Sequence, residues 1–327
     1  MMKILTAIGL LTGLAAATLL VAWQGFGTIG AALVSLGAGL LLLPLAFLPH
    51  LVFAAWSWGL LFAPGQAPGF AAALRAMWMG LSADMLLPLA SLGGEVVKVR
   101  VLMQAGVGGR DAGASVVVDK TVQAISLVLW GLIGIAILVW IEADGELVAG
   151  ALIASALLAA GVGGFIFVQH AGTFGFLAKV FGKAHASEGL AVGAADLDGM
   201  IRALYRRPGR ILLASAIRLL SRVALTAEVW LAAYFMGFPI TLWEALMLKS
   251  LTGALRGAAF VVPGGWGVQE GGYVVLGGLL GLSPEFMLAV SLATRARELL
   301  VSLPGLVAWQ HGEGRSLLKR LASGGRR

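Results

Sequence analysis

The chain has 327 residues, of which 59% are hydrophobic and only 12% are charged, and its mean hydropathy is +0.94. A soluble domain carries roughly 25% charged residues, so this composition excludes a fold of this size with a fully wetted surface. The net charge of +7 does not indicate nucleic acid, because the basic residues gather in a few loops and the tail, where positive-inside topology and anionic lipid headgroups explain them.

Apolar runs of 18 or more residues recur along the chain, and each is long enough to cross the ~30 Å hydrocarbon layer as a helix. They lie near residues 4–22, 30–62, 114–140, 147–168, 209–236, 242–262, 267–282 and 285–309. The first run could be a signal peptide, but it has no convincing cleavage site and continues into Trp23, so we interpret it as a span. The sequence therefore predicts an all-α integral membrane protein with about eight transmembrane helices.

The stretch 70–100 is apolar but is interrupted by Asp84, Pro88 and Glu95. Non-helical backbone at membrane depth survives only where protein or a wet cavity satisfies its polar groups. We therefore expect a re-entrant hairpin here rather than a span.

Lysine and arginine alternate between the two sides if the chain has eight spans, one hairpin and two cytoplasmic termini, since loops 23–29, 141–147 and 237–243 contain neither residue. This pattern predicts one transmembrane domain over residues 1–310, followed by a basic cytoplasmic tail over 311–327. Apolar residues at helical spacing in 169–208 predict a cytoplasmic amphipathic segment, with a solvated linker as the alternative.

Charged side chains inside spans are costly and mark function by default. Candidate substrate-binding residues of this kind are Lys98, Arg100, Asp119, Lys120, Arg218, Arg222, Glu228, Arg256 and Arg297. The alternative is mutual neutralisation between helices, and the spacing of Arg295 and Glu298 fits such a pair. Arg218 and Arg222 lie one turn apart on one face, where two cations require an anionic partner.

Two glycine-rich breaks carry a carboxylate each and occupy corresponding positions in two halves of the chain. Their candidate site residues are Gly93, Gly94 and Glu95 in the first, and Pro263, Gly264, Gly265, Gln269 and Glu270 in the second. Paired broken helices point to the midplane site of a transporter and to a two-repeat architecture. Close helix packing at Gly267-x-x-x-Gly271 is the alternative, but it explains neither glutamate.

Metal and cofactor sites have little support. The chain has no cysteine, and His50, His170, His185 and His311 lie far apart with no H-x-x-x-H pair. We expect no metal, no cofactor and no nucleic-acid partner.

The first break, with Val116-Val117-Val118-Asp119-Lys120-Thr121 after it, resembles a motif of the lysylphosphatidylglycerol synthase transmembrane family, also called the flippase-like family. The second break matches the family's Pro-Gly-Gly-x-Gly-x-x-Glu motif, and Arg297 precedes the last proline as in that family. The 116–121 stretch is most similar to the hopanoid-biosynthesis-associated branch. The family usually has arginine where this chain has Lys98 and Lys120, which removes bidentate phosphate binding there.

The resemblance implies an inner-membrane lipid translocase for a hopanoid or a related lipid such as a phospholipid. Arginines 218, 222 and 256 would meet the headgroup, and Glu95 and Glu270 would gate the path or couple it to protons. Because the aminoacyl-transferase domain of two-domain relatives is missing, we expect no such catalysis. The alternatives are an intramembrane lipid-modifying transferase and a scaffold for lipid biosynthesis. The expected partners are membrane lipids, and a homo-oligomer or lipid-biosynthesis enzymes are left open.

Overall fold

The computed structural model describes residues 36–62, 65–86, 93–141, 199–259 and 265–324, with side chains as far as residue 313, and a few single residues besides. The expected spans near 4–22 and 147–168, most of the segment 169–208, and the site candidates Pro263 and Gly264 lie outside the described residues.

The regular elements of the described part are all helices, which confirms the all-α prediction. They are α3 (Gly39–Gly59), α4 (Phe70–Leu86), α5 (Gly93–Gln104), α6 (Gly109–Ile141), α10 (Pro208–Ala224), α11 (Thr226–Phe235), α12 (Leu242–Ala258), α13 (Val268–Leu279) and α14 (Pro284–Gly324). Among the described residues, α3 and α6 are each long and apolar enough to cross a membrane.

The first turns of two helices show why they begin where they do. Pro208 stands at the start of α10, where its missing N–H costs nothing. A capping box opens α12: the Thr241 hydroxyl accepts from the Glu244 backbone N–H at 3.2 Å, and the Glu244 carboxylate accepts from the Thr241 N–H at 2.6 Å.

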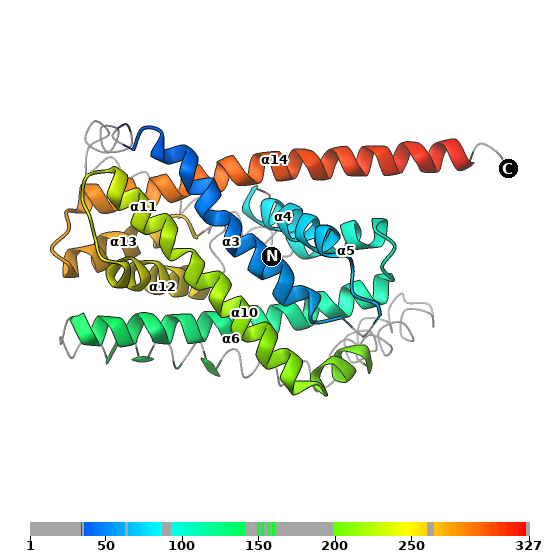
Figure 1. Cartoon of the computed structure of the whole chain (residues 1–327), viewed down its shortest axis with the longest axis horizontal. Coiled ribbons are helices and arrows are strands. Elements are labelled where there is room, and N and C mark those ends of the chain that lie inside the picture. Colours follow the sequence, from blue (N-terminus) through cyan, green and yellow to red (C-terminus); the bar gives the residue numbers. More distant parts are fainter. Residues whose placement is uncertain are drawn as a thin grey trace, which may run out of the picture.

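The helices form two halves with the same plan. A short broken hairpin precedes a long helix in each half: α4 and α12 both have 17 residues, and α5 and α13 both have 12. Each half packs against the other: α12 of the second half packs on α6 of the first, and α14 of the second half packs on α4 of the first. Figure 1 shows α6 and α14 running in opposite directions along opposite sides of the bundle. This arrangement agrees with two repeats of inverted topology.

The second half differs from the sequence prediction, which assigned separate crossings to 242–262 and 267–282. At 1.5 Å per residue, the 12 residues of α13 extend roughly 18 Å, well short of the ~30 Å apolar layer. Helices α12 and α13 therefore form a second broken hairpin, the counterpart of α4 and α5. A hairpin returns to the side from which it entered, so this correction leaves the expected position of the C-terminus unchanged.

Helix α14 does not stop where the basic tail was expected to begin, because it continues from Pro284 to Gly324. Its later part packs beside α5, where the Arg100 guanidinium donates to the Glu313 carboxylate at 2.9 and 3.2 Å. Figure 1 shows this end of α14 extending past the other helices.

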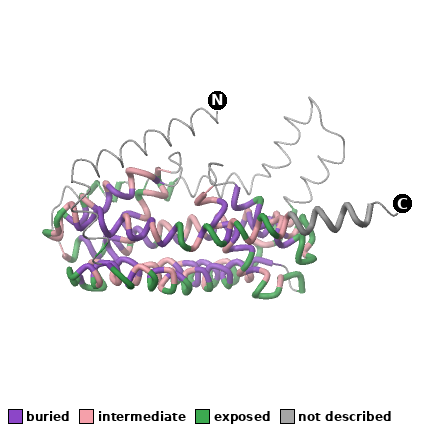
Figure 2. Tube along the Cα trace, turned by 90° about the horizontal axis from the view of Figure 1, so that it is seen from above, coloured by how far each residue is buried: buried purple, intermediate pink, exposed green. Residues whose placement is uncertain are grey.

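Apolar side chains lie on the outside as well as in the core. Trp140, Leu212, Val96 and Val307 are each more than 60% exposed, and Figure 2 shows exposed positions spread along the outer faces of the helices. In water these side chains would be a severe liability. They are the expected contacts with lipid.

The first hairpin depends on a close approach between α4 and α5. A Cβ atom added to Gly94 would lie 2.5 Å from the Asp84 carboxylate and closer still to the Gly80 carbonyl oxygen. The Gly94 N–H also donates to Asp84 Oδ1 at 2.7 Å. We expect Gly94→Ala to destabilise the protein by about 1–3 kcal/mol through overpacking, measured as a lower melting temperature in detergent.

Gly271→Ala is the matched control, because Gly271 is helical and a Cβ there meets no atom within 4 Å. It should be neutral or should stabilise by up to about 1 kcal/mol. Equal melting temperatures for Gly94→Ala and the wild type would contradict the tight contact.

Candidate functional site

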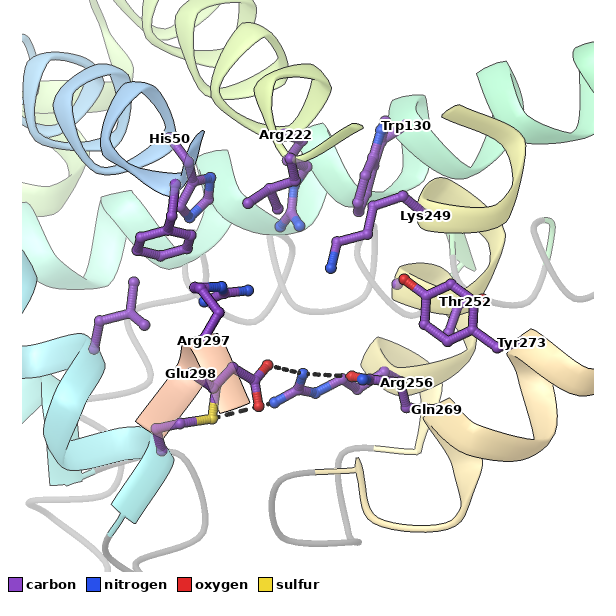
Figure 3. Close-up of a pocket in the computed structure, with 15 residues that line it drawn as sticks. His50, Trp130, Arg222, Lys249, Thr252, Arg256, Gln269, Tyr273, Arg297 and Glu298 are labelled. Carbon is purple, nitrogen blue, oxygen red and sulfur yellow. Dashed lines mark hydrogen bonds and ion pairs between the residues drawn. The ribbon is translucent and has the colours of Figure 1, made fainter. Parts of the chain in front are cut away.

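A cavity of about 200 Å³ lies in the bundle where the two hairpins meet. It is lined by Phe47, His50, Leu81, Met85, Trp130, Arg222, Leu225, Lys249, Thr252, Gly253, Arg256, Gln269, Tyr273, Arg297 and Glu298. Figure 3 shows Arg222 and Lys249 reaching in from one side, with the Glu298–Arg256 pair on the other. Four of the lining side chains are cationic and one, Glu298, is a carboxylate.

The hairpins touch at Arg256, near the end of α12. Its Nη1 donates to Glu298 Oε1 at 2.6 Å and to Gln269 Oε1 at 2.8 Å, and its Nη2 approaches Met85 Sδ of α4 at 3.3 Å. One guanidinium thereby joins both broken hairpins and α14. This contact agrees with the expectation that the two broken segments contribute to one site, since Met85 closely precedes the first break and Gln269 belongs to the second.

Arg295 extends this chain of ion pairs away from the cavity. Its Nε donates to Glu270 at 3.1 Å, its Nη1 donates to Glu298 at 3.1 Å, and its Nη2 donates to the Gly265 carbonyl at 3.2 Å. Glu270 also accepts from the Gly267 N–H at 2.7 Å, at the start of α13. The Arg295–Glu298 pair expected from the sequence is present, and Glu270 sits behind the cavity wall as a fully buried partner.

Glu228 of α11 is fully buried and is shared by two cavity cations. Its carboxylate pairs with Lys249 at 3.1 Å and with the Arg297 guanidinium. Arg297 also lies 4.2 Å from the centroid of the Phe47 ring, a cation–π contact. One carboxylate therefore serves two cations, and one positive charge is left in excess.

Arg222 differs from the other cavity cations. Its Nε donates to Ser126 Oγ and its Nη2 donates to the Gln123 carbonyl, both at 2.9 Å, and it lies 5.6 Å from the Trp130 ring centroid. No carboxylate of the described residues forms an ion pair with it. The charge of Arg222 is thus unpaired among the described residues.

Arg218, one turn earlier on α10, belongs to a second cluster. It pairs with the fully buried Asp119, which also approaches Lys98 at 3.5 Å. Glu95 in turn pairs with Lys98 at 3.1 Å and with Lys120 at 2.5 Å. The sequence predicted an anionic partner for Arg218 and Arg222. The structure gives Arg218 such a partner, Asp119, but gives Arg222 none among the described residues. Glu228 pairs with Lys249 and Arg297 instead of with either of them.

Most candidate residues fall into these two clusters. Arg100 of α5 lies outside both clusters and pairs with Glu313 of α14. Gly265 contributes its carbonyl to Arg295 and adopts a φ of 62°, which an L side chain would strain. Gln269 is held by Ser291 and Thr294 at 3.2 and 3.0 Å while it accepts from Arg256.

Of the fifteen residues that line the cavity, only Arg222, Arg256, Gln269 and Arg297 were candidates, and the lining residues that sequence reasoning missed include His50, Trp130, Lys249 and Tyr273. Lys249 shares a helical stripe with Thr252 and Arg256, which was a usable signal. No sequence signal indicated His50, because its Nδ1 contacts the carbonyl and the hydroxyl of Ser221, which lies 171 residues away in the chain. Tyr273 looked like an ordinary core aromatic.

Two hydroxyls at the cavity have no partner among the described residues. Tyr273 is fully buried and Thr252 is 2% exposed, yet neither hydroxyl makes a hydrogen bond. Figure 3 shows the Tyr273 hydroxyl turned toward the space between the two walls. Buried polar groups without a partner are rare in native proteins, so both hydroxyls could bind a polar group that enters the cavity.

Comparison with known proteins is consistent with this architecture. The family model of the lysylphosphatidylglycerol synthase TM region matches residues 9–305, which is most of the chain and includes both hairpins and the cavity. No curated protein and no solved structure shows significant similarity. The chain is therefore a membrane protein that belongs to the family of the lysylphosphatidylglycerol synthase transmembrane region.

Proposed function

We propose that the protein is a lipid translocase in which a polar headgroup enters the central cavity while the apolar part of the lipid stays in the bilayer. The observation that carries this proposal is a cavity with four cationic lining side chains and one carboxylate, enclosed between two broken hairpins. Such a site binds a polar group at membrane depth, where an intramembrane charge otherwise has a high cost.

The inverted relation of the two halves supports movement between leaflets. In transporters with inverted repeats, the substrate site lies at the repeat interface and is formed by broken helices. Here the α4–α5 hairpin contributes Leu81 and Met85 to the cavity, and the α12–α13 hairpin contributes Arg256 and Tyr273. Opening either hairpin would expose the same headgroup to one side of the membrane.

The residues that line the cavity fit a lipid-modifying transferase less well than a translocase. Such an enzyme needs a nucleophile or a general acid and base open to the substrate. The Ser221 hydroxyl lies 2.8 Å from His50 Nδ1, but it is fully buried and donates to the His50 carbonyl at 2.9 Å. We therefore favour transport without catalysis over lipid modification.

We place the protein in a bacterial inner membrane with both termini in the cytoplasm. The cysteine-free chain allows a direct test with an impermeant thiol reagent and single replacements at Asp144 and Gly324. Asp144→Cys should be labelled in intact cells and Gly324→Cys only after lysis. The reverse labelling would contradict this orientation.

The function itself is tested with the purified full chain in vesicles. A fluorescent phospholipid or hopanoid in the inner leaflet should become accessible to an external membrane-impermeant quencher faster than in protein-free vesicles, without chemical change to the lipid. A scaffold would leave the rate at that of protein-free vesicles, and a transferase would give a new product. Hopanoids are the cargo that the resemblance suggests, and phospholipids are the second class to assay.

A further inference from the structure

We infer that two ion pairs, Glu95–Lys120 and Glu270–Arg295, are equivalent clasps that close the cavity toward the two ends of the bundle, and that the first clasp opens more readily than the second. The inference rests on the proposed translocase function and assigns positioning residues to the two gates of that site. It follows from an internal repeat of the chain, from the place of each pair beside the cavity, and from the partners that each charge keeps when its helix moves.

The two clasps occupy equivalent positions in the internal repeat. Helices α5 and α6 begin 16 residues apart, as do α13 and α14, and the second pair of helices begins 175 residues after the first. The same shift takes Glu95 to Glu270. It also takes Lys120 to Arg295. In each half, a carboxylate in the first turn of the hairpin's second helix therefore pairs with a cation on the long helix that follows.

Each clasp lies beside the cavity. Near the first clasp, Gln123 donates to Asp119 at 2.7 Å, and its carbonyl accepts from the cavity residue Arg222 at 2.9 Å. At the second clasp, Glu270 directly follows the cavity residue Gln269. Helices α6 and α14 begin at opposite ends of the bundle, as Figure 1 shows, so the two hairpins return to opposite ends. Each clasp therefore closes the cavity toward a different end.

Separation of α5 from α6 leaves only one charge without a partner among the described residues. Glu95 keeps Lys98, three residues later on the same helix, at 3.1 Å. Asp119, which Lys98 approaches at 3.5 Å across the two helices, keeps Arg218 of α10. Lys120 loses its carboxylate, but its side chain is already 30% exposed, so water can solvate the ammonium group.

Separation of α13 from α14 has a higher cost. Glu270 is fully buried, and Arg295 is its one ion-pair partner among the described residues, at 3.1 Å. The same movement takes Gln269 away from the hydroxyls of Ser291 and Thr294. Breaking a pair of buried charges costs more than breaking a pair whose lysine already reaches water. The guanidinium also holds its partners in a fixed fork, which an ammonium group lacks.

The cavity therefore opens more often at the end of the first hairpin than at the end of the second. In the orientation proposed above, the first hairpin enters from the cytoplasm and returns to it, and the second hairpin does the same from the outer side. In the absence of lipid, we expect the cavity to be reached mainly from the cytoplasm.

The accessibility of a cavity cysteine from each side tests the inference. Leu225 lines the cavity and belongs to neither hairpin, so Leu225→Cys in the cysteine-free chain reports entry through either end. The probe is sulfonatoethyl methanethiosulfonate, a small impermeant anion, applied to right-side-out or inside-out membrane vesicles. Labelling should be about tenfold faster in the inside-out vesicles, where the cytoplasmic side meets the reagent. Asp144→Cys and Gly324→Cys verify the sidedness of each preparation.

Two matched variants assign the effect to the clasps. Glu270→Gln weakens the second clasp and should raise labelling of Leu225→Cys from the outer side at least roughly fivefold, whereas Glu95→Gln should raise labelling from the cytoplasmic side only. Lys120→Arg keeps the charge and adds a forked contact, so it should slow cytoplasmic labelling a few-fold. This conservative variant keeps the test decisive if a glutamine variant does not fold.

Equal labelling of the wild type from both sides, or unchanged outer labelling in a folded Glu270→Gln protein, would overturn the inference. Cytoplasmic labelling of Lys120→Arg at the wild-type rate would overturn it as well. The assay detects opening of the cavity rather than movement of lipid. If the cavity opens as described but no lipid moves in the vesicle assay, the clasps stand and the translocase proposal fails. If lipid moves while labelling responds to neither clasp, translocation stands and the assignment of the gates is wrong.

Discussion

Glu228→Gln is expected to lower the free energy of unfolding by about 3–5 kcal/mol, because Lys249 and Arg297 would lose the buried carboxylate that they share. Removing one member of a buried ion cluster leaves its partners charged in a medium that solvates them poorly. The melting temperature of the purified protein in detergent measures this loss. It should fall well below that of the wild type at every pH where lysine and arginine are charged.

Glu313→Gln is the matched control. It removes the same group from the Arg100 pair, where both side chains are partly exposed, and such pairs contribute at most about 1 kcal/mol. Adding Arg297→Gln to Glu228→Gln should restore part of the lost stability, because one of the two stranded cations disappears. A wild-type melting temperature for Glu228→Gln would refute the shared-carboxylate description.

Arg222→Gln is expected to leave the protein folded, with a stability loss of about 1 kcal/mol, while lipid movement in vesicles falls at least roughly tenfold. The substitution strands no carboxylate of the described residues, but it removes one of the four cations that line the cavity, the one without a carboxylate partner among the described residues. The same change one turn earlier, Arg218→Gln, provides the contrast. It leaves Asp119 buried with Lys98 at 3.5 Å and should cost about 3 kcal/mol of stability.

The pair of variants separates a headgroup role from a structural role. If Arg222 served only to hold α10 against α6, its loss would lower the melting temperature as much as the loss of Arg218. Wild-type rates of lipid movement by a stable Arg222→Gln protein would exclude Arg222 from the transport path.

Much of this site could be located from the sequence, because charge inside an apolar run is a strong signal at any position. The Arg295–Glu298 pair was also predictable, since residues three apart on a helix are neighbours. The partners of Arg218 and Glu228 were not. Asp119 lies 99 residues from Arg218, and Glu228 lies 69 residues from Arg297, so only the packing of different helices could show which carboxylate serves which cation.

The second hairpin was misjudged for a related reason. Hydropathy shows that a segment is apolar, but it does not show whether the segment crosses the membrane or turns back. Two glycines lie directly before α13: Gly265 and Gly267 adopt φ values of 62° and 78°, which are not helical, so α13 begins only at Val268. Close helix packing, the alternative explanation of the glycines in and after the second break, accounts for only some of them. Gly277 accommodates the Met287 side chain, whereas a Cβ atom added to Gly271 would meet no atom within 4 Å.

The position of the headgroup is the central claim, and photo-crosslinking tests it most directly. The ten methionines can be replaced together by a diazirine analogue of similar shape, and the vesicles can carry a lipid with an isotopically labelled headgroup. Met85 lines the cavity, Met247 is buried in the core, and Met103 is 47% exposed on α5. After irradiation, mass spectrometry should find the labelled headgroup on the Met85 peptide and not on the Met247 peptide. Headgroup adducts at Met103 with none at Met85 would contradict entry of the lipid into the cavity.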